Sequence, residues 1–312
     1  MRPLRLVMTA ILAIACAACA SNSSPPPERR AADLRLSIRH LNKGTMFYNK
    51  GCFVKAVRHF QEAHERFAAQ DNIQGTAESL NSLANAYYRL NDMDSAVLLY
   101  DEALELYRLQ QDIAGQIRAL ANKSTALASS GRFKEAGTAL DQADALAASK
   151  TILTGLRLKA RAILKIKAGD TTEAKRLLLK SMRAISKKEA GQYASAQYTM
   201  GYLLLSTQQP QEAIPYLEKA LDADRSAHAN FGIGQDLEAL GDCHMQLRQY
   251  RQALTCYKRS LKIFVLLNNA NQIQRTRTKL ELSAAKADAD IQATRHWVDQ
   301  WLAGEREANV CR

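Results

Sequence analysis

The sequence has few of the residues that interrupt helices. It contains 6 prolines and 2 tryptophans in 312 residues, and aromatic residues make up 6% of the chain. Only Pro210 and Pro215 fall after residue 30. No stretch alternates polar and apolar residues with the period of two that a half-buried strand requires. These absences argue against a sheet and predict an all-α chain.

Motifs for catalysis and for metal binding are also lacking. Gly232 and Gly234 open a glycine-containing stretch, but the third glycine of a phosphate-binding loop is missing and no strand precedes it. His59 and His64 are five residues apart, whereas metal ligands on one helix face are spaced by three or four. The sequence therefore predicts no catalytic residue, no metal site and no cofactor.

Residues 80–104 form the unit that the rest of the chain repeats. The first half places apolar residues at i, i+3, i+4 and i+7, on one helix face: Leu80, Leu83, Ala84 and Tyr87. The second half places them at i, i+4 and i+7: Ala96, Tyr100 and Ala103. Asn91 and Asp92 predict a turn between the halves. The unit is two amphipathic helices folded back on each other, since neither could bury its apolar stripe alone.

Five more copies of this unit are present. The small residue at Ala84 recurs as Gly44, Ser124, Ala162, Gly201 and Gly241. The first alanine of the second helix, Ala96, recurs as Ala56, Ala136, Ala174, Ala213 and Ala253. The copies are spaced by 38 to 40 residues, which is the spacing of a repeat architecture.

This pattern resembles the tetratricopeptide repeat family, whose helix pairs stack into a right-handed superhelix. The resemblance covers about residues 39–266 and implies a solenoid of six helix-turn-helix repeats within residues 31–268. It is loosest where Lys165 replaces the usual aromatic residue and Ser181 the usual alanine. The period exceeds the family's 34, so we expect about one extra helical turn per unit, mostly at the end of the second helix, as in residues 104–111.

Local signals complete the solenoid. Asp170 followed by Glu173 predicts a capped helix start in the fourth copy. Residues 270–285 and 290–303, within the segment 269–312, predict two further helices. Trp297 and Trp301 belong to an apolar stripe that either covers the end of the solenoid or binds a partner.

The N-terminus is typical of an export signal. Residues 1–15 have a short basic start and about ten apolar residues, too few for an ordinary membrane span. Residues 12–16 resemble a bacterial lipobox, which implies cleavage before Cys16 and diacylation of its thiol. Cys19 is the alternative acceptor, and cleavage after Ala20 without lipidation is a third possibility. No aspartate follows either cysteine, so the resemblance implies outer-membrane sorting. Residues 16–30 are polar and proline-rich and predict a tether.

Cysteine number limits the disulfides. Of 6 cysteines, lipidation leaves five, and an odd number cannot all pair within one chain. Cys243 and Cys256 lie on the two helices of the sixth copy and either form a disulfide or pack as free apolar residues.

A second face of the first helices predicts a partner-binding groove. In the family this face lines the concave side, and here it carries Tyr48, Asn81, Asn85, Tyr88, Arg118, Asn122, Thr125, Lys159, Tyr198 and Tyr202. Asparagine offers both a donor and an acceptor to a peptide backbone, and tyrosine adds flat area with a polar tip. The alternative is that these positions are merely solvated.

Charge is distributed unevenly. The formal net charge is +12, and residues 150–188 hold twelve Lys or Arg against Asp170 and Glu173. Lys175, Arg176 and Lys180 form a candidate basic patch, which is either a docking surface for an acidic partner or a solvated face.

Together these patterns predict a non-enzymatic adaptor, an outer-membrane lipoprotein whose periplasmic solenoid binds proteins or peptides of the cell envelope. It resembles the broad group that includes pilotins of type IV pili and adaptors of peptidoglycan hydrolases. One alternative is a soluble periplasmic binder of an anionic glycan or lipid head group. Another is an enzyme whose site is hidden in the repeats. Nothing indicates nucleic acid as a partner.

Overall fold

The computed structural model describes residues 27–148, 153–186, 189–304 and 310–311, and within these ranges it contains helices and no strand. The predicted all-α class is confirmed. The six predicted copies are six helix pairs: α2 (Pro27–Lys50) with α3 (Phe53–Ala69), α4 (Ile73–Arg89) with α5 (Met93–Leu109), α6 (Ile113–Ser129) with α7 (Phe133–Ala147), α8 (Thr154–Lys167) with α9 (Thr171–Ala184), α10 (Ala190–Ser206) with α11 (Pro210–Ser226), and α12 (Asn230–Gln246) with α13 (Tyr250–Leu266). Two more helices follow, α14 (Ala270–Ala287) and α15 (Gln292–Leu302).

Short polar turns end one helix and start the next. Asn91 has φ of 68°, in the left-handed region, and this stops α4. Asp92 then accepts a hydrogen bond from the backbone N–H of Ser95 at 3.1 Å and caps α5. The predicted cap at Asp170 is confirmed, because its side chain accepts from the N–H of Glu173 at 3.2 Å.

Two expectations about lengths need correction. Both α4 and α5 have 17 residues, and α5 ends at Leu109, so the second helix is not preferentially extended. Three-residue turns precede α4, separate α4 from α5 and follow α5, so the two helices of this repeat share the extra length equally. The expected tether also ends earlier than residue 30, because α2 begins at Pro27; proline is tolerated at a first helical position, and Glu28 favours a helix start. Cys16 and Cys19 lie outside the described residues.

The fourth repeat, the loosest copy, has the shortest helices of the six pairs, 14 residues in both α8 and α9. Its Ser181 is fully buried and donates to the carbonyl oxygen of Gly155 at 2.7 Å. Ser260 makes the same bond to Gly234 at 2.7 Å in the sixth repeat. A serine therefore replaces alanine in the seam without leaving a buried hydroxyl unpaired.

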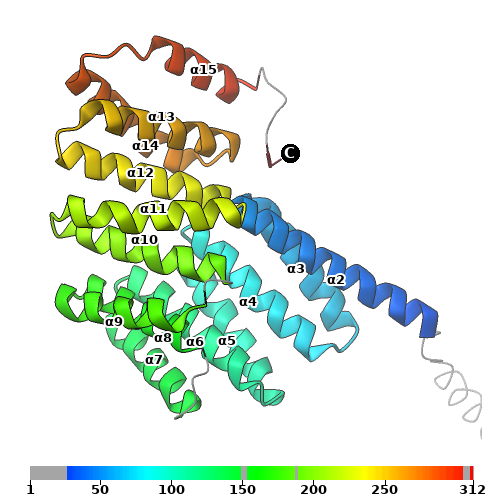
Figure 1. Cartoon of the computed structure of the whole chain (residues 1–312). Coiled ribbons are helices and arrows are strands. Elements are labelled where there is room, and N and C mark those ends of the chain that lie inside the picture. The colour runs from blue at the N-terminus through cyan, green and yellow to red at the C-terminus, as the bar shows by residue number, and fades with distance from the viewer. Residues whose placement is uncertain (1–26, 149–152, 187–188, 305–309, 312) are drawn as a thin grey trace, which may run out of the picture.

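The pairs stack into a superhelix that curls until its first repeat meets its sixth. Helix α2 contacts α12, and one end of α2 lies beside α12 while its other end projects away from the stack (Figure 1). Phe53 at the start of α3 packs edge-on against Phe231 of α12, with ring centroids 4.9 Å apart. Repeats far apart in sequence thus share one hydrophobic cluster.

A disulfide reinforces this closure. Cys52, in the turn between α2 and α3, is bonded to Cys311, with 5.4 Å between the Cα atoms. Cys243 and Cys256 are free, so the disulfide considered for the sixth repeat is wrong. Cys243 instead packs inside a core cluster of leucines and alanines, as a small apolar residue does.

The last helix covers the end of the solenoid. Val298 of α15 is buried, and Trp297 and Trp301 pack against the cluster formed by α13 and α14, with their rings 5.0 Å apart. This is what the capping interpretation predicts. Across the described ranges, every helix is too short or too polar to span a bilayer.

Candidate partner-binding site

The predicted groove asparagines bond to each other and to neighbouring helices. The Oδ1 of Asn85 accepts from the hydroxyl of Tyr100 at 2.7 Å and from Nδ2 of Asn122 at 3.2 Å. Asn81 is only 5% exposed, and its Oδ1 has no hydrogen-bond partner among the described residues. Asn81 is therefore buried, and Asn85 and Asn122 use part of their hydrogen-bonding capacity on each other; their role in a partner-binding groove stays a prediction. Adjacent first helices pack so closely that their amides tie α4, α5 and α6 together.

In the sixth repeat, the positions equivalent to Asn81 and Asn85 carry acidic residues that were not among the predicted site residues. Glu238 and Asp242 stand where Asn81 and Asn85 stand in the second repeat, and Tyr257 donates to Asp242 at 2.7 Å as Tyr100 does to Asn85. Extending the repeat register to α12 would have found both residues.

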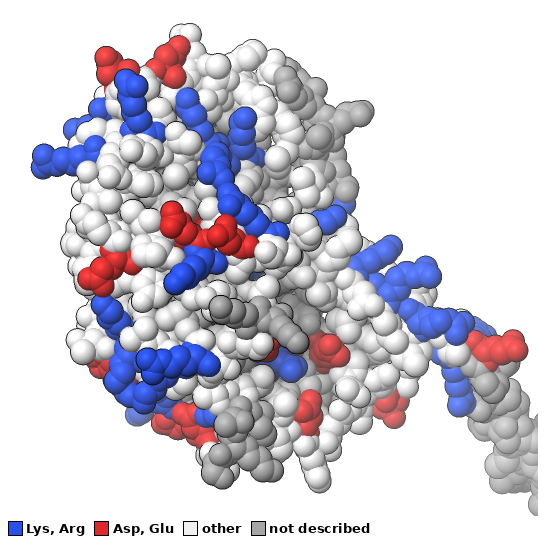
Figure 2. Space-filling model, viewed as in Figure 1, with Lys and Arg blue, Asp and Glu red and all other residues white. Residues whose placement is uncertain are grey.

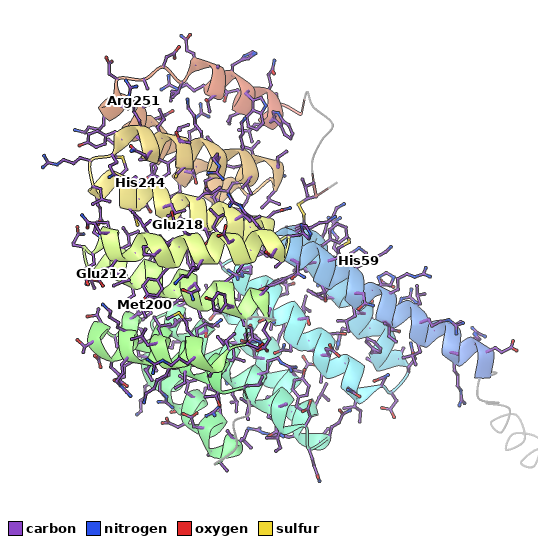
Figure 3. The ribbon with its side chains drawn as sticks, viewed as in Figure 1. His59, Met200, Glu212, Glu218, His244 and Arg251 are labelled. Atoms are coloured by element: carbon purple, nitrogen blue, oxygen red, sulfur yellow. A yellow bond between two sulfur atoms is a disulfide. The ribbon has the colours of Figure 1, made fainter. Side chains whose placement is uncertain are left out.

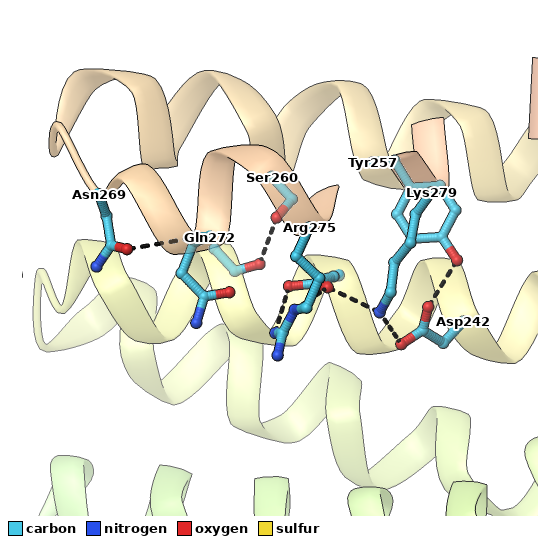
Figure 4. Close-up of polar contacts among 9 residues, drawn as sticks. Asp242, Tyr257, Ser260, Asn269, Gln272, Arg275 and Lys279 are labelled. Carbon is cyan, nitrogen blue, oxygen red and sulfur yellow. Dashed lines mark hydrogen bonds and ion pairs between the residues drawn. The ribbon is translucent and has the colours of Figure 1, made fainter. Parts of the chain in front are cut away.

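These carboxylates are paired with cations of α14 (Figure 4). Glu238, 2% exposed, accepts two hydrogen bonds from the guanidinium of Arg275, both at 2.8 Å. Lys279 lies 2.7 Å from Glu238 and 2.6 Å from Asp242. A buried carboxylate is tolerated only when paired and hydrogen-bonded, so this network fixes α14 against α12 and α13.

The remaining predicted groove residues lie on several different helices. Tyr198 and Tyr202 stack on α10, with ring centroids 6.4 Å apart, and Tyr202 is 46% exposed. Arg118 is exposed on α6, and Thr125 is half-buried on the same helix. Tyr88 places its hydroxyl 3.5 Å from that of Ser129. The groove as one partner-binding surface stays a prediction.

Arg89 of α4 lies where several helices meet. It was not among the predicted site residues. Its Nε donates to the hydroxyl of Tyr48 at 3.2 Å, and its guanidinium lies 5.7 Å from the ring centre of Phe231. Lys159 donates to Ser195 at 2.9 Å, and burial, with the nearby charge of Arg89, lowers its pKa to about 8. These contacts place a positive centre inside the superhelix.

Asp224 of α11 faces this centre, and Asp236 of α12 lies beside Asp224. Burial raises the pKa of Asp224 to about 6, against the opposing charge of Arg89. Burial, together with the neighbouring carboxylate of Asp224, raises the pKa of Asp236 to about 9. Both shifts disfavour ionisation of the pair, because two ionised carboxylates in one buried space repel each other.

A cavity of about 850 Å³ opens beside Arg89. It lies where the C-terminal ends of α2, α4, α6 and α8 approach the N-terminal ends of α3, α12 and α14. Both disulfide cysteines, Cys52 and Cys311, line it. Among the described residues no cluster of His, Cys, Asp or Glu could hold a metal ion. The arrangement is suited to binding a ligand by polar contacts.

The candidate basic patch on α9 is partly neutralised. Lys175 lies 3.1 Å from Glu212 in the first turn of α11 (Figure 3), and Arg176 donates to Glu173 at 2.6 Å. Lys180 is exposed. Figure 2 shows basic side chains spread along the projecting α2 and over the α12–α15 end, with acidic ones among them.

Comparison with known proteins agrees with this architecture. A tetratricopeptide repeat family model matches residues 35–108 and 151–226, and a second such model matches residues 237–263. The chain belongs to the tetratricopeptide repeat family, whose fold is typical of protein–protein interaction scaffolds. No curated protein matches the sequence.

Solved structures share the fold at low identity. A Rap protein complexed with Competence and Sporulation Factor is 14% identical, with a TM-score of 0.56 over 84% of this chain and 75% of that chain. The Rap conjugation gene regulator of the plasmid pLS20, in complex with the Phr* peptide, is 14% identical, with a TM-score of 0.59 over 89% and 79%. A signal transduction ATPase with a tetratricopeptide repeat sensor from Pyrococcus horikoshii is 13% identical, with a TM-score of 0.61 over 85% of this chain and 39% of that one.

Proposed function

We propose that this protein is a non-enzymatic scaffold of the bacterial cell envelope that binds a partner protein inside its superhelix. The observation that carries the proposal is the cavity of about 850 Å³, whose walls come from both ends of the repeat array. Such a site can enclose a segment of another chain. One of the Rap structures of similar fold contains a peptide, which agrees with a peptide segment as the ligand here.

The proposed anchor is a lipid on Cys16 in the outer membrane, facing the periplasm, in the manner of a pilotin or of an adaptor for peptidoglycan hydrolases. Helix α2, the first described element after the signal-like segment, projects from the body (Figure 1). Its exposed side chains include Arg29, Arg30, Arg35 and Arg39. Basic side chains close to a lipid anchor are attracted to anionic head groups, which supports this location.

Substituting the proposed lipid acceptor tests the anchor. We expect Cys16→Ser to abolish incorporation of labelled fatty acid and to move the protein from the membrane fraction to the soluble periplasmic fraction. Cys19→Ser is the matched control and should leave both unchanged. Release by Cys19→Ser alone would reassign the acceptor, and unlabelled wild-type protein in the soluble fraction would favour the soluble periplasmic alternative.

A further inference from the structure

The cavity beside Arg89 is lined by side chains of one charge. Among the residues that the structure describes, its charged side chains are all cations: Lys55, Arg58, Arg89, Lys167 and Arg275. No aspartate or glutamate occurs in this described part of the lining. The chain as a whole carries 31 acidic residues, so their absence from the described lining distinguishes this cavity from the rest of the surface. Low-dielectric walls with one sign of charge concentrate ligands of the opposite sign.

Two of these cations are held in place by other side chains. Arg275 is paired with Glu238, and Arg89 is bonded to Tyr48. Arg58 and Lys167 are exposed and, within the described ranges, lie beyond ion-pair distance of any carboxylate. They come from α3 and from the end of α8, so they face the cavity from different repeats. Arg58 and Lys167 therefore give the cavity positive charge that no ion pair among the described residues neutralises.

Amide side chains occur between the cations. Asn91, Asn271 and Gln235 line the cavity from the α4–α5 turn, α14 and α12. Each amide offers donors and an acceptor, which match the alternating N–H and C=O groups of an extended backbone. Phe53 and Phe231 add an apolar contact on the same wall. Lipid head groups in a bilayer would not reach this wall, because the cavity lies between the first repeat and α12–α14.

We infer that this cavity binds an extended, acidic peptide segment, with Arg58 and Lys167 contacting its carboxylates and the amides contacting its backbone. The inference rests on the proposed function, since it names the chemical class of the partner segment. The volume falls within the range of ligand sites and is too small for a folded domain, so a short segment is bound. Association is steered by charge and weakens with salt.

Fluorescence anisotropy with two labelled peptides, hexaglutamate and hexaglutamine, tests this inference on the full mature protein. The double variant Arg58→Glu/Lys167→Glu reverses the free cavity charge. The matched control Arg108→Glu/Lys134→Glu makes the same change of net charge at exposed positions of α5 and α7, outside the cavity lining. All four positions are exposed, so circular dichroism should show unchanged helicity for both variants.

We expect hexaglutamate to bind wild type at least about tenfold more tightly than hexaglutamine, and the cavity variant to lose about tenfold in affinity. The control should change by less than about twofold. Equal loss in both variants, or no binding of hexaglutamate at low salt, would overturn the inference. Tighter binding of polygalacturonate, lost in the same cavity variant, would replace the peptide with an anionic glycan. None of these results decides the proposed function itself, because capture of a partner protein in cells is measured in a separate experiment.

Discussion

Replacing Cys52 and Cys311 together with serine should lower the free energy of unfolding by about 2–4 kcal/mol. The bond joins residues separated by 259 positions, so it removes a large amount of conformational freedom from the unfolded chain. It also holds the C-terminal end against the α2–α3 turn, where the superhelix closes. Thermal and urea unfolding, followed by circular dichroism, measure the loss.

The free cysteines provide the control for this change. Cys256→Ser alters a half-buried thiol that forms no disulfide, so it should shift stability by less than about 1 kcal/mol. Reductant should lower the melting temperature of wild type and of Cys256→Ser and should leave the double variant unaffected. A wild-type melting temperature that is insensitive to reductant would show that the closure does not depend on this bond.

Replacing Gly241 with alanine should destabilise the sixth repeat by about 1–3 kcal/mol, although alanine is the better helix former. A Cβ at this position would lie 2.5 Å from the ring of Tyr257. The ring cannot shift easily, since it is fully buried and its hydroxyl is bonded to Asp242 at 2.7 Å. Overpacking is therefore relieved only by displacing α12 from α13.

Gly137 in α7 is the matched control. A Cβ there would find its nearest neighbour, an atom of Leu164, at 4.0 Å. Gly137→Ala should therefore stabilise the protein by about 0.5–1 kcal/mol, through the helix preference of alanine alone. The two alanine variants are predicted to shift the urea midpoint in opposite directions. A shift of the same sign in both would contradict the placement of Gly241 at a close helix crossing.

Much of the fold could be predicted because its determinants are local and recur. Small residues such as Ala84 and Gly241 mark each helix crossing, and Asp170 marks a helix start. The terminal helices α14 and α15 could be placed for the same reason. Each of these features depends on neighbours within one or two repeats, where a helical period of 3.6 fixes which side chains share a face.

The candidate site was less predictable because it depends on the curvature of the whole array. A small rotation per repeat accumulates along the stack and brings Cys52 beside Cys311, and Arg89 beside Asp224. No local sequence pattern predicts either of these two contacts. The contacts of the asparagines could not be predicted for a different reason. The period places Asn85 on the predicted face, but only the spacing of adjacent helices shows that its Oδ1 is bonded to Asn122.

The central claim is that a partner binds inside the superhelix, and site-specific photocrosslinking in intact cells tests it most directly. A photoreactive amino acid would replace Gln235, which lines the cavity, or Leu98, which is 71% exposed on α5. We predict a discrete protein adduct from position 235, reduced when Arg58→Glu/Lys167→Glu is also present, and none from position 98. An adduct from position 98 with none from position 235 would contradict the claim and place the partner on the outer face.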